Sequence, residues 1–350
     1  MNNQLPVDRH YHIGVVVKDY RKYIEEFSRF FGIERWELRR QDSTRMPDAT
    51  LHGKPVKHSF LSVLGSKGKI AFELCQPLSG DSIYGEFLET HGEGMHHLFP
   101  TICTPAEFRR LRPWLESEGI NISQSATVCD TIEYYYLDSS PYLATTIEVL
   151  CPLRPDWERD PRLKPDEIIN IDRNIANSSV CPTEKIYHAC VVTNNRRLSV
   201  RDNFERLMGV DRWFDFDNQT GVSSEGVHYF GEQAETRFRL SLGRKNGFGI
   251  EVVEQIYGPT IYRDMLEKQG EGLNHIMTTL CGLEEFERVK RSLESQGMPI
   301  VQDGRVSGMC YYCYADAREK LAGLFVELLC PLTEDFLANK EVSEIVVGPD

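Results

Sequence analysis

The sequence has no long apolar run. Within its 350 residues, no stretch approaches the length of a membrane span or of the hydrophobic core of a signal peptide, and the first ten residues, MNNQLPVDRH, are mostly polar. The absence of such segments predicts a cytoplasmic protein that does not act at a membrane.

Positive charge is also scarce. The chain has 40 Lys and Arg against 53 Asp and Glu, which gives a net charge of −13. Such a chain repels a nucleic-acid backbone unless a local basic patch intervenes. The nearest candidate, FRRLRPW (108–114), is typical of the solvated face of a helix. We therefore expect no nucleic-acid partner.

Closely spaced cysteine pairs are rare as well. Ten cysteines are present, but only Cys310 and Cys313 form a close pair, and a zinc ribbon needs a second such pair. Positions i and i+3 of a strand face opposite sides, which further disfavours metal binding there. The other cysteines lie mostly in apolar runs such as FELCQP, where a reduced thiol behaves as a small hydrophobic side chain.

The chain does contain an internal repeat. FFGIERW (30–36) matches LMGVDRW (207–213), FLETHGEGMHHL (87–98) matches MLEKQGEGLNHI (265–276), and IEVLCPL (147–153) matches VELLCPL (326–332). The offset drifts only from 177 to 179 residues, which indicates a tandem duplication with small loop insertions. A chain of this length is also expected to form two globular units rather than one.

Each half shows the same order of elements twice: a strand, a helix and further strands. In the first module, apolar residues recur at helical spacing in DYRKYIEEFSRFFG (19–32), which ends at Gly32. In the second, Thr104 and Glu107 form a capping box that begins a helix. We predict four modules in two domains, with a linker rich in Pro, Asp and Asn between them and a short tail. The predicted ranges are 1–153 and 185–333 for the domains, 154–184 for the linker and 334–350 for the tail.

Glutamates stand in the middle of four apolar strand candidates. They are Glu73, Glu148, Glu251 and Glu327. A buried carboxylate is costly unless a cation or hydrogen-bond donors compensate it, so each one needs a partner. The alternative for any single one is a position on the solvated face of an antiparallel sheet. Their equivalent places in the two halves favour a shared role.

Histidines lead strands at four further places: His12, His97, His188 and His275. A lone histidine in such a place is more often a core residue than a ligand. Here, however, the four histidines and four glutamates recur in the same order, 176 to 179 residues apart. Two imidazoles and two carboxylates form a set that suits Zn, Ni, Co, Mn or Fe(II), with positions left for water or substrate. We expect up to two such divalent ions per chain.

One of two adjacent histidines changes between the halves. His96 and His97 in the first half correspond to Asn274 and His275 in the second. Consecutive residues of a strand face opposite ways, so only one member of the pair can point at a metal ion. We expect His97 to do so and His96 to face elsewhere.

These residues resemble the vicinal oxygen chelate superfamily, whose glyoxalase fold curls two βαβββ modules around one metal. HIGVVVKD (12–19), FELCQPL (72–78), GEGMHHL (92–98) and IEVLCPL (147–153) are similar to the metal-site segments of methylmalonyl-CoA epimerase and glyoxalase I. The resemblance implies an α+β fold of four βαβββ modules forming two glyoxalase-fold domains. It implies one site from His12, Glu73, His97 and Glu148, and another from His188, Glu251, His275 and Glu327. Pairing of modules across the halves is an alternative that would regroup these ligands.

The ligand count separates the chemistries of this superfamily. Extradiol dioxygenases and 4-hydroxyphenylpyruvate dioxygenase are also duplicated, but they resemble a three-ligand design held in one half only, whereas both halves here keep four. Four ligands in both halves favour redox-neutral chemistry. In such chemistry the metal acts as a Lewis acid on a carbonyl and stabilises the enediolate that is left after a neighbouring C–H loses its proton.

Several residues are candidates for the groups that act on the substrate. Methylmalonyl-CoA epimerase uses a glutamate on the third strand of its first module, but the matching stretch VKHSFLSVL (56–64) has none and offers His58 instead. Resemblance to glyoxalase I implies that a ligand glutamate doubles as the base, which adds Glu148, Glu73, Glu327 and Glu251 as candidates. Tyr134, Tyr136, Tyr312 and Tyr314 are candidate hydrogen-bond donors, with core packing as the alternative.

We therefore predict a metal-dependent epimerase or isomerase with a small-molecule substrate. The tandem architecture resembles the cyclitol enzymes that act on 2-epi-5-epi-valiolone, which implies a polyhydroxy ketone as substrate. The alternatives are an acyl-CoA epimerase of the methylmalonyl-CoA type, a glyoxalase I-like lyase, an Fe(II) extradiol or 2-oxo acid dioxygenase, and a non-catalytic resistance protein that sequesters antibiotics. Duplication removes the need for a dimer to complete a site, so either a monomer or a homodimer is expected.

Overall fold

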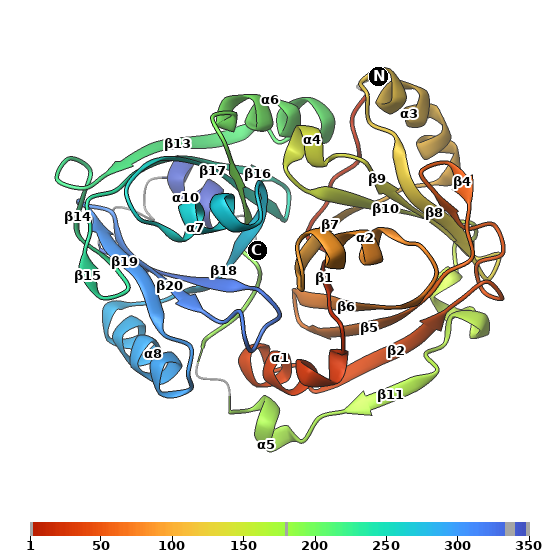
Figure 1. Cartoon of the computed structure of the whole chain (residues 1–350), viewed down its shortest axis with the longest axis horizontal. Helices are drawn as coiled ribbons and strands as arrows, with labels where there is room; N and C mark the ends of the chain where they lie inside the picture. Colours follow the sequence, from red (N-terminus) through yellow and green to blue (C-terminus); the bar gives the residue numbers. More distant parts are fainter. Residues whose placement is uncertain (1–2, 179–180, 333–339, 348–350) are drawn as a thin grey trace.

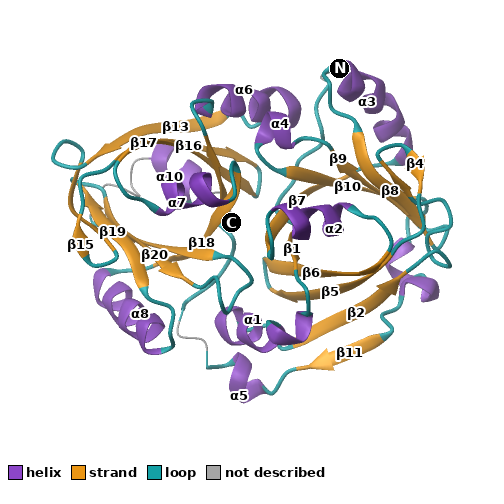
Figure 2. Cartoon of the chain, in the orientation of Figure 1, coloured by secondary structure: helices purple, strands orange, loops and turns teal. Residues whose placement is uncertain are grey.

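Two strongly curled sheets, each formed by one half of the chain, stand side by side (Figures 1 and 2). The computed structural model describes residues 3–178, 181–332 and 340–347. The predicted α+β class, with one curled sheet per half as in the glyoxalase fold, is confirmed. We refer to the sheet of β1–β11 with its helices as the first cup, and to that of β12–β21 as the second cup.

The first cup has an 11-stranded sheet in the order β11-β2-β5-β6-β1-β7-β10-β9-β8-β3-β4. Its edge strand β11 comes from the segment predicted as a linker and pairs with β2. The elements are β1 (His12–Val16), α1 (Ile24–Phe31), β2 (Arg35–Gln41), β3 (Thr50–Leu51), β4 (Lys54–Pro55), β5 (Ser59–Lys67), β6 (Ile70–Ser79), α2 (Ile83–Thr90), β7 (Gly94–Ile102), α3 (Pro105–Ser117), β8 (Ile122–Val128), β9 (Ile132–Leu137), α4 (Ser140–Leu143), β10 (Thr146–Pro152), β11 (Glu167–Asn170) and α5 (Arg173–Ala176), with short 3-10 turns at Tyr20–Lys22, Trp157–Arg159 and Pro161–Leu163.

The second cup repeats this arrangement in a 10-stranded sheet, in the order β13-β16-β17-β12-β18-β21-β20-β19-β14-β15. Its elements are β12 (His188–Thr193), α6 (Arg197–Met208), β13 (Arg212–Gln219), β14 (Ser224–Tyr229), β15 (Glu232–Gln233), β16 (Arg237–Lys245), β17 (Phe248–Tyr257), α7 (Ile261–Lys268), β18 (Gly272–Leu280), α8 (Leu283–Ser295), β19 (Ile300–Val306), β20 (Cys310–Asp316), β21 (Phe325–Pro331) and α10 (Lys340–Val346). Helix α10 lies in the predicted tail; residues 333–339 and 348–350 of that tail lie outside the described part of the chain.

The centre of each sheet brings four strands together in the same way. In the first cup β1 pairs antiparallel with β7, while β6 lies parallel to β1 and β10 lies parallel to β7. In the second cup β12, β18, β17 and β21 repeat these pairings. Both modules of each cup therefore come from one half of the chain, and the alternative of pairing across the halves does not hold.

The predicted helix signals agree with the observed ends. Helix α1 ends at Gly32, which adopts the left-handed conformation with φ 71° that glycine tolerates best. Helix α3 begins at the predicted capping box, in which Thr104 and Glu107 satisfy each other's backbone N–H groups. The FRRLRPW stretch lies on this helix and buries Phe108 while its arginines stay exposed, as expected for a solvated face.

The N-terminal segment links the two cups before the first sheet begins. Asp8 accepts a backbone hydrogen bond of 2.8 Å from Gly247, and Nε2 of His10 bonds the carbonyl of Gly249 at 2.9 Å. His10 also packs its ring against Phe248, with centroids 4.5 Å apart. These contacts hold residues 8–10 on the second cup while β1, two residues later, starts the first.

All ten cysteines are described; none forms a disulfide in the structure, and eight of them are buried. Cys310 and Cys313 both lie on β20 and are buried. Neither belongs to a metal-ligating cluster in the described chain.

Candidate metal centres

The four central strands of the first cup bring one predicted ligand each to a common point. β1 contributes His12, β6 contributes Glu73, β7 contributes His97 and β10 contributes Glu148. Gly14 pairs with Glu73 on one side and with His97 on the other. A Cβ atom on Gly14 would lie 1.8 Å from Cε1 of His97, so the imidazole occupies the space that a side chain there would need.

The first quartet, His12, Glu73, His97 and Glu148, is compact. Nε2 of His12 lies 3.1 Å from Oε2 of Glu148 and 3.5 Å from Oε2 of Glu73. Nε2 of His97 lies 3.5 Å and 3.7 Å from the same two oxygens, and 3.3 Å from Nε2 of His12. All four ligand atoms lie within 4.8 Å of one another.

The second quartet, His188, Glu251, His275 and Glu327, has the same origin on β12, β17, β18 and β21 but is wider. Nε2 of His188 lies 3.0 Å from Oε2 of Glu327 and 3.9 Å from Oε2 of Glu251. Nε2 of His275 lies 3.2 Å from Glu251 and 3.4 Å from Glu327. Only the two histidines and Glu327 form a group within 4.8 Å; Glu251 groups with His275 and the Cys190 thiol instead.

A divalent ion fits the space between these atoms. Nitrogen and oxygen ligands bind such ions at about 2.1 Å, which places neighbouring ligands about 3.0 Å apart at a right angle and about 3.4 Å apart at the tetrahedral angle. The observed separations of 3.0 to 3.9 Å span these values. Several of the facing atoms are also buried without a hydrogen bond, as expected for lone pairs directed at a cation. They are Oε2 of Glu148, Glu251 and Glu327 and Nε2 of His188 and His275.

The histidines of each quartet keep one of its carboxylates ionised. Burial alone raises the pKa of Glu148, but interaction with the facing rings of His12 and His97 outweighs burial and lowers that pKa to about 2. The two histidines of the second quartet lower the pKa of Glu327 to about 2 in the same way. Anionic carboxylates are the form that a divalent ion needs as ligands.

The two quartets differ in their access to water. The side chains of His12 and Glu73 are each 12% exposed, whereas those of His188 and Glu251 are 3% and 5% exposed. Glu148, Glu251 and Glu327 are buried, and Glu73 is mostly covered. None of the four therefore lies on a solvated face of its sheet, which was the alternative to a role as a ligand.

His97 belongs to the first quartet and His96 does not, but the strict alternation of side chains used to place them does not hold in β7. β7 carries a bulge here: Gly14 pairs with His97, but the next residue, Val15, pairs with Met95, which leaves His96 unpaired. A bulge breaks the alternation of side chains along a strand, so neighbouring residues no longer point to opposite faces. The Nδ1 atoms of His96 and His97 come within 3.0 Å, and the His96 ring is buried.

The second cup has the same bulge at Asn274. Cys190 pairs with His275 and Val191 pairs with Leu273, so Asn274 is the unpaired residue. Oδ1 of Asn274 lies 3.1 Å from Nδ1 of His275. An amide oxygen and a neutral imidazole nitrogen both accept a hydrogen bond from Nδ1–H, which leaves Nε2 of the ligand histidine free to face the quartet. This shared role explains why histidine and asparagine replace each other at this position.

The predicted tyrosines divide into two pairs with different surroundings. Tyr136 and Tyr314 stand beside the ligand histidines His97 and His275, each with ring centroids 4.9 Å apart. The Tyr314 hydroxyl lies 3.2 Å from Oε1 of Glu327, to which it donates. Tyr134 and Tyr312 lie two residues earlier on their strands, farther from the histidines.

His58 is not brought to either quartet. It precedes β5, is buried, and stacks on Phe60 with ring centroids 5.8 Å apart and planes 10° apart. Neither ring nitrogen has a hydrogen-bond partner among the described residues. Burial lowers the pKa of His58, so the ring stays neutral at neutral pH.

A cavity of about 80 Å³ opens onto the second quartet. Its wall contains His188, Glu251 and Glu327 at one end, together with the tyrosine side chains of β20 and the apolar side chains of β13, β16 and α10. The lining residues used below are Phe214, Phe216, Asn218, Phe238, Tyr312 and Val346. Sequence reasoning missed these residues, because alternation marks them only as strand positions and does not tell which of them face a space.

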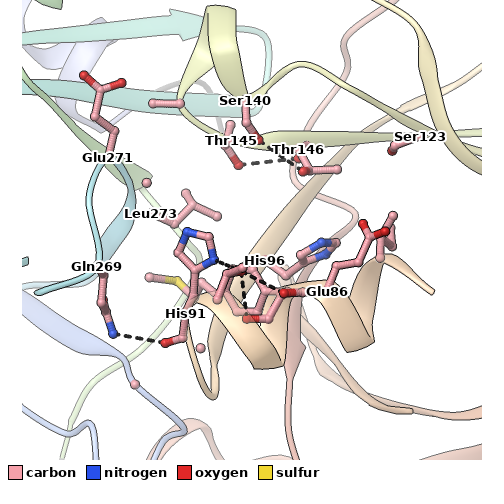
Figure 3. Close-up of a pocket in the computed structure, with 18 of the residues that line it drawn as sticks. Glu86, His91, His96, Ser123, Ser140, Thr145, Thr146, Gln269, Glu271 and Leu273 are labelled. Carbon is pink, nitrogen blue, oxygen red and sulfur yellow. Dashed lines mark hydrogen bonds between the residues drawn. The ribbon is translucent and has the colours of Figure 1, made fainter. Parts of the chain in front are cut away.

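A larger pocket of about 380 Å³ lies between the cups and contains no quartet member in its described lining. Figure 3 shows Gln269, Glu271 and Leu273 of the second cup opposite Thr145 and Thr146 of the first. The wall of this pocket also includes His96, the residue that contacts His97.

Comparison with known proteins agrees with this geometry. Residues 11–131 match the model of the Glyoxalase/Bleomycin resistance protein/Dioxygenase superfamily. The likeness covers most of the first half of the chain. Members of this superfamily are mostly enzymes that use divalent metal ions, in agreement with the clusters of candidate ligands described above.

Solved structures share the fold over almost the whole chain. A triple mutant of 4-hydroxymandelate synthase from Streptomyces coelicolor has a TM-score of 0.59, with 13% sequence identity over 97% of this chain and 99% of that one. A fusion protein of a xylose isomerase-like TIM barrel with 4-hydroxyphenylpyruvate dioxygenase has a TM-score of 0.48, with 10% identity over 94% of this chain and 50% of its own. No curated protein matches the sequence. The helices in the described ranges are all too short or too polar to cross a membrane.

Proposed function

We propose that this chain is a divalent-metal-dependent isomerase that epimerises a carbon next to a carbonyl group. The observation that carries the proposal is the two-histidine, two-glutamate quartet in both cups, with facing ligand atoms 3.0 to 3.9 Å apart. A second carboxylate in each quartet suits proton transfer next to a metal, because one carboxylate can remain a ligand while the other accepts the proton. The likeness of the first half to this superfamily supports metal dependence.

A bound divalent ion supplies a Lewis acid that polarises the carbonyl and stabilises the charge that develops on its oxygen. The protein residues then have to hold the substrate and move one proton. In the second quartet Glu327 is held at both oxygens, since Oε1 accepts from Tyr314 and Oε2 lies 3.0 Å from His188. The Oε2 atom of Glu251 lies 3.2 Å from His275 and 3.9 Å from His188, but no tyrosine hydroxyl donates to Glu251 among the described residues. We assign Glu251 as the proton acceptor and Glu327 as the fixed ligand.

Two measurements test the proposal. Metal analysis of the purified protein is expected to give two ions of Zn, Ni, Co or Mn per chain. Incubation in D2O with α-hydroxy ketones, keto-cyclitols, acyl-CoA thioesters and hemithioacetals is expected to place deuterium on the α-carbon of one substrate class, without oxygen consumption.

A matched pair of variants on β17 sharpens this test. Glu251→Gln is expected to abolish deuterium exchange, because an amide does not accept the proton. Glu254→Gln, three residues along the same strand, is the control, since Glu254 lies 3.8 Å from Arg239 and outside the quartet. Exchange that survives in the first variant, or that is absent with every compound, contradicts the proposal.

An Fe(II) dioxygenase is the second candidate. The aromatic side chains Phe214, Phe216 and Phe238 in the cavity wall favour it, because they suit an aromatic substrate. The fold likeness to 4-hydroxymandelate synthase agrees with this candidate but shows the fold alone. An oxygen electrode decides between the two: oxygen uptake with Fe(II) and an aryl 2-oxo acid favours the dioxygenase, and exchange without uptake favours the isomerase.

A further inference from the structure

Met46 and Ser224 mark one of the buried positions at which the two cups differ. Met46 of the first cup and Ser224 of the second occupy equivalent places, 178 residues apart, in the segment after the second strand of each cup. Met46 is 1% exposed and packs in a buried cluster with Phe60, Tyr134 and Tyr136. Its Sδ atom lies 3.6 Å from the Tyr134 hydroxyl, which donates to it. The methionine therefore fills the space beside Tyr134.

Ser224 places a much smaller side chain at the corresponding position. Its hydroxyl donates to Oδ1 of Asn218 at 2.8 Å, and Asn218 lines the cavity beside the second quartet. Tyr312, the counterpart of Tyr134, lines the cavity of about 80 Å³. Its hydroxyl is buried, and the side chain that interacts with it is Asn218, whose Oδ1 already accepts from Ser224. Asn218 offers its amide N–H to this hydroxyl, so the hydroxyl's own proton has no acceptor among the described residues, and a ligand acceptor would complete it.

The remaining wall of this cavity limits the chemistry of that ligand. One end is formed by His188, Glu251 and Glu327, and the sides are mostly aromatic and aliphatic, with Asn218 as a further polar group. A polyhydroxylated ring such as a cyclitol would need a hydrogen-bond partner for each of its hydroxyl groups, and aromatic and aliphatic walls provide few of them. The described lining also contains no Lys or Arg to neutralise the phosphates of an acyl-CoA. Both observations favour a compact, uncharged and largely apolar body.

We propose that substrate binds and reacts in the second cup only, and that the first quartet holds its ion as a structural centre. This inference rests on the proposed function and deepens it. The substrate class is a compact carbonyl compound with an apolar body and one hydrogen-bond acceptor for the Tyr312 hydroxyl. It replaces the cyclitol implied by the sequence resemblance. A cavity that holds benzene measures about 150 Å³, so the space of about 80 Å³ admits the reacting end of such a compound.

The test uses the full chain loaded with Co2+ and a small bidentate oxygen ligand, acetohydroxamate, whose binding changes the visible spectrum of the ion it contacts. The unmodified protein, with two Co2+ bound, is expected to show one saturable binding event per chain. Ser224→Met is expected to weaken that event at least tenfold while both ions remain bound. Met46→Ser is the matched control and is expected to leave the affinity of this event unchanged.

Two further variants keep the test decisive if Ser224→Met fails to fold. Tyr312→Phe removes only the hydroxyl whose proton lacks an acceptor and is expected to weaken the binding of acetohydroxamate several-fold while the melting temperature changes little. Ser224→Val is a smaller addition in the same place and is expected to weaken binding as well. Two equal binding events in the unmodified protein, or one event that these three variants leave unchanged, overturn the inference.

The outcomes also separate this inference from the proposed function. Spectral binding needs no turnover, so a single Ser224-sensitive event without deuterium exchange on any substrate supports the second cup as the binding site and contradicts the isomerase. Deuterium exchange that persists in Ser224→Met and Tyr312→Phe supports the isomerase and contradicts its assignment to the second cup.

Discussion

The Nδ1 atoms of His96 and His97 lie 3.0 Å apart, although the two residues are adjacent on one strand. The bulge in β7 makes this contact possible, and Asn274 makes the same contact with His275 in the second cup. Such a hydrogen bond selects the tautomer of the ligand histidine and fixes its ring. Burial strongly lowers the pKa of His96, and the His97 ring beside it lowers it further, so the accepting nitrogen stays unprotonated.

Substitution of His96 tests this positioning role. His96→Leu is expected to weaken the binding of the first ion by about 10- to 100-fold, because the ring of His97 loses its partner. His96→Asn copies the second cup and is expected to retain affinity within a few-fold. Competition with a chromophoric chelator measures both. Equal affinity in the leucine variant and the unmodified protein would show that the contact plays no part in metal binding.

Gly14 provides a steric test of the first quartet. In Gly14→Ala the new Cβ would lie 1.8 Å from Cε1 of His97, so the imidazole has to move away from the other ligands. We expect the metal content to fall from two ions per chain to one. The second ion is the internal control, because Cys190, at the equivalent register between Glu251 and His275, already carries a Cβ and the second quartet is unchanged in this variant. Two tightly bound ions in Gly14→Ala would contradict the described position of His97.

The pKa of His58 predicts how stability depends on pH. Burial lowers this pKa in the folded chain below the value of about 6.5 that the unfolded chain keeps. The unfolded state therefore binds the proton first, and the free energy of unfolding falls as the pH drops below about 6.5. In His58→Leu the free energy of unfolding no longer falls with pH through this group, because leucine does not bind a proton. The substitution also removes two buried ring nitrogens that have no hydrogen-bond partner. We expect it to raise the free energy of unfolding by about 1 kcal/mol at pH 7.5.

Urea denaturation at pH 7.5 and pH 5.0 measures the effect of His58. The advantage of the leucine variant is expected to be larger at pH 5.0, since only the unmodified chain then has a histidine to protonate on unfolding. An advantage that is the same at both pH values, or that is reversed, would show that His58 is solvated or paired in solution.

Arg244 attaches α10 to the second cup. Its guanidinium donates to the carbonyls of Ile345 at 2.6 Å, Val346 at 3.1 Å and Tyr187 at 2.8 Å. Burial lowers its pKa to about 10, so it stays charged at neutral pH and interacts with the C-terminal carbonyls of the helix. Arg244→Met leaves these carbonyls without a donor and is expected to lower the free energy of unfolding by about 2 to 3 kcal/mol.

Arg239→Met on the same strand is the control for Arg244. The Arg239 side chain is 40% exposed and pairs with Asp217 at 3.1 Å, so its loss is expected to cost less than about 0.5 kcal/mol. Chemical denaturation compares the two variants, and limited proteolysis reports the release of α10. Equal stability of both variants would show that α10 is held by its apolar contacts alone.

The sequence by itself determined the duplication, the α+β class and the identity of the residues that meet in each quartet. These features are local or periodic: alternation shows a strand, and a glutamate in an apolar strand stands out because burying a charge alone is costly. The grouping into two quartets came from the family resemblance, which left pairing across the halves open until the sheet order excluded it.

Only the tertiary structure decided the contact between His96 and His97 and the difference between the cups. A bulge depends on how β7 pairs with β1, about 80 positions earlier in the chain, and it lets two adjacent side chains touch where strict alternation would separate them. The cavity beside the second quartet is likewise enclosed by strands distant in sequence and by α10. Whether a side chain such as Met46 fills a space depends on those neighbours, which no local pattern records.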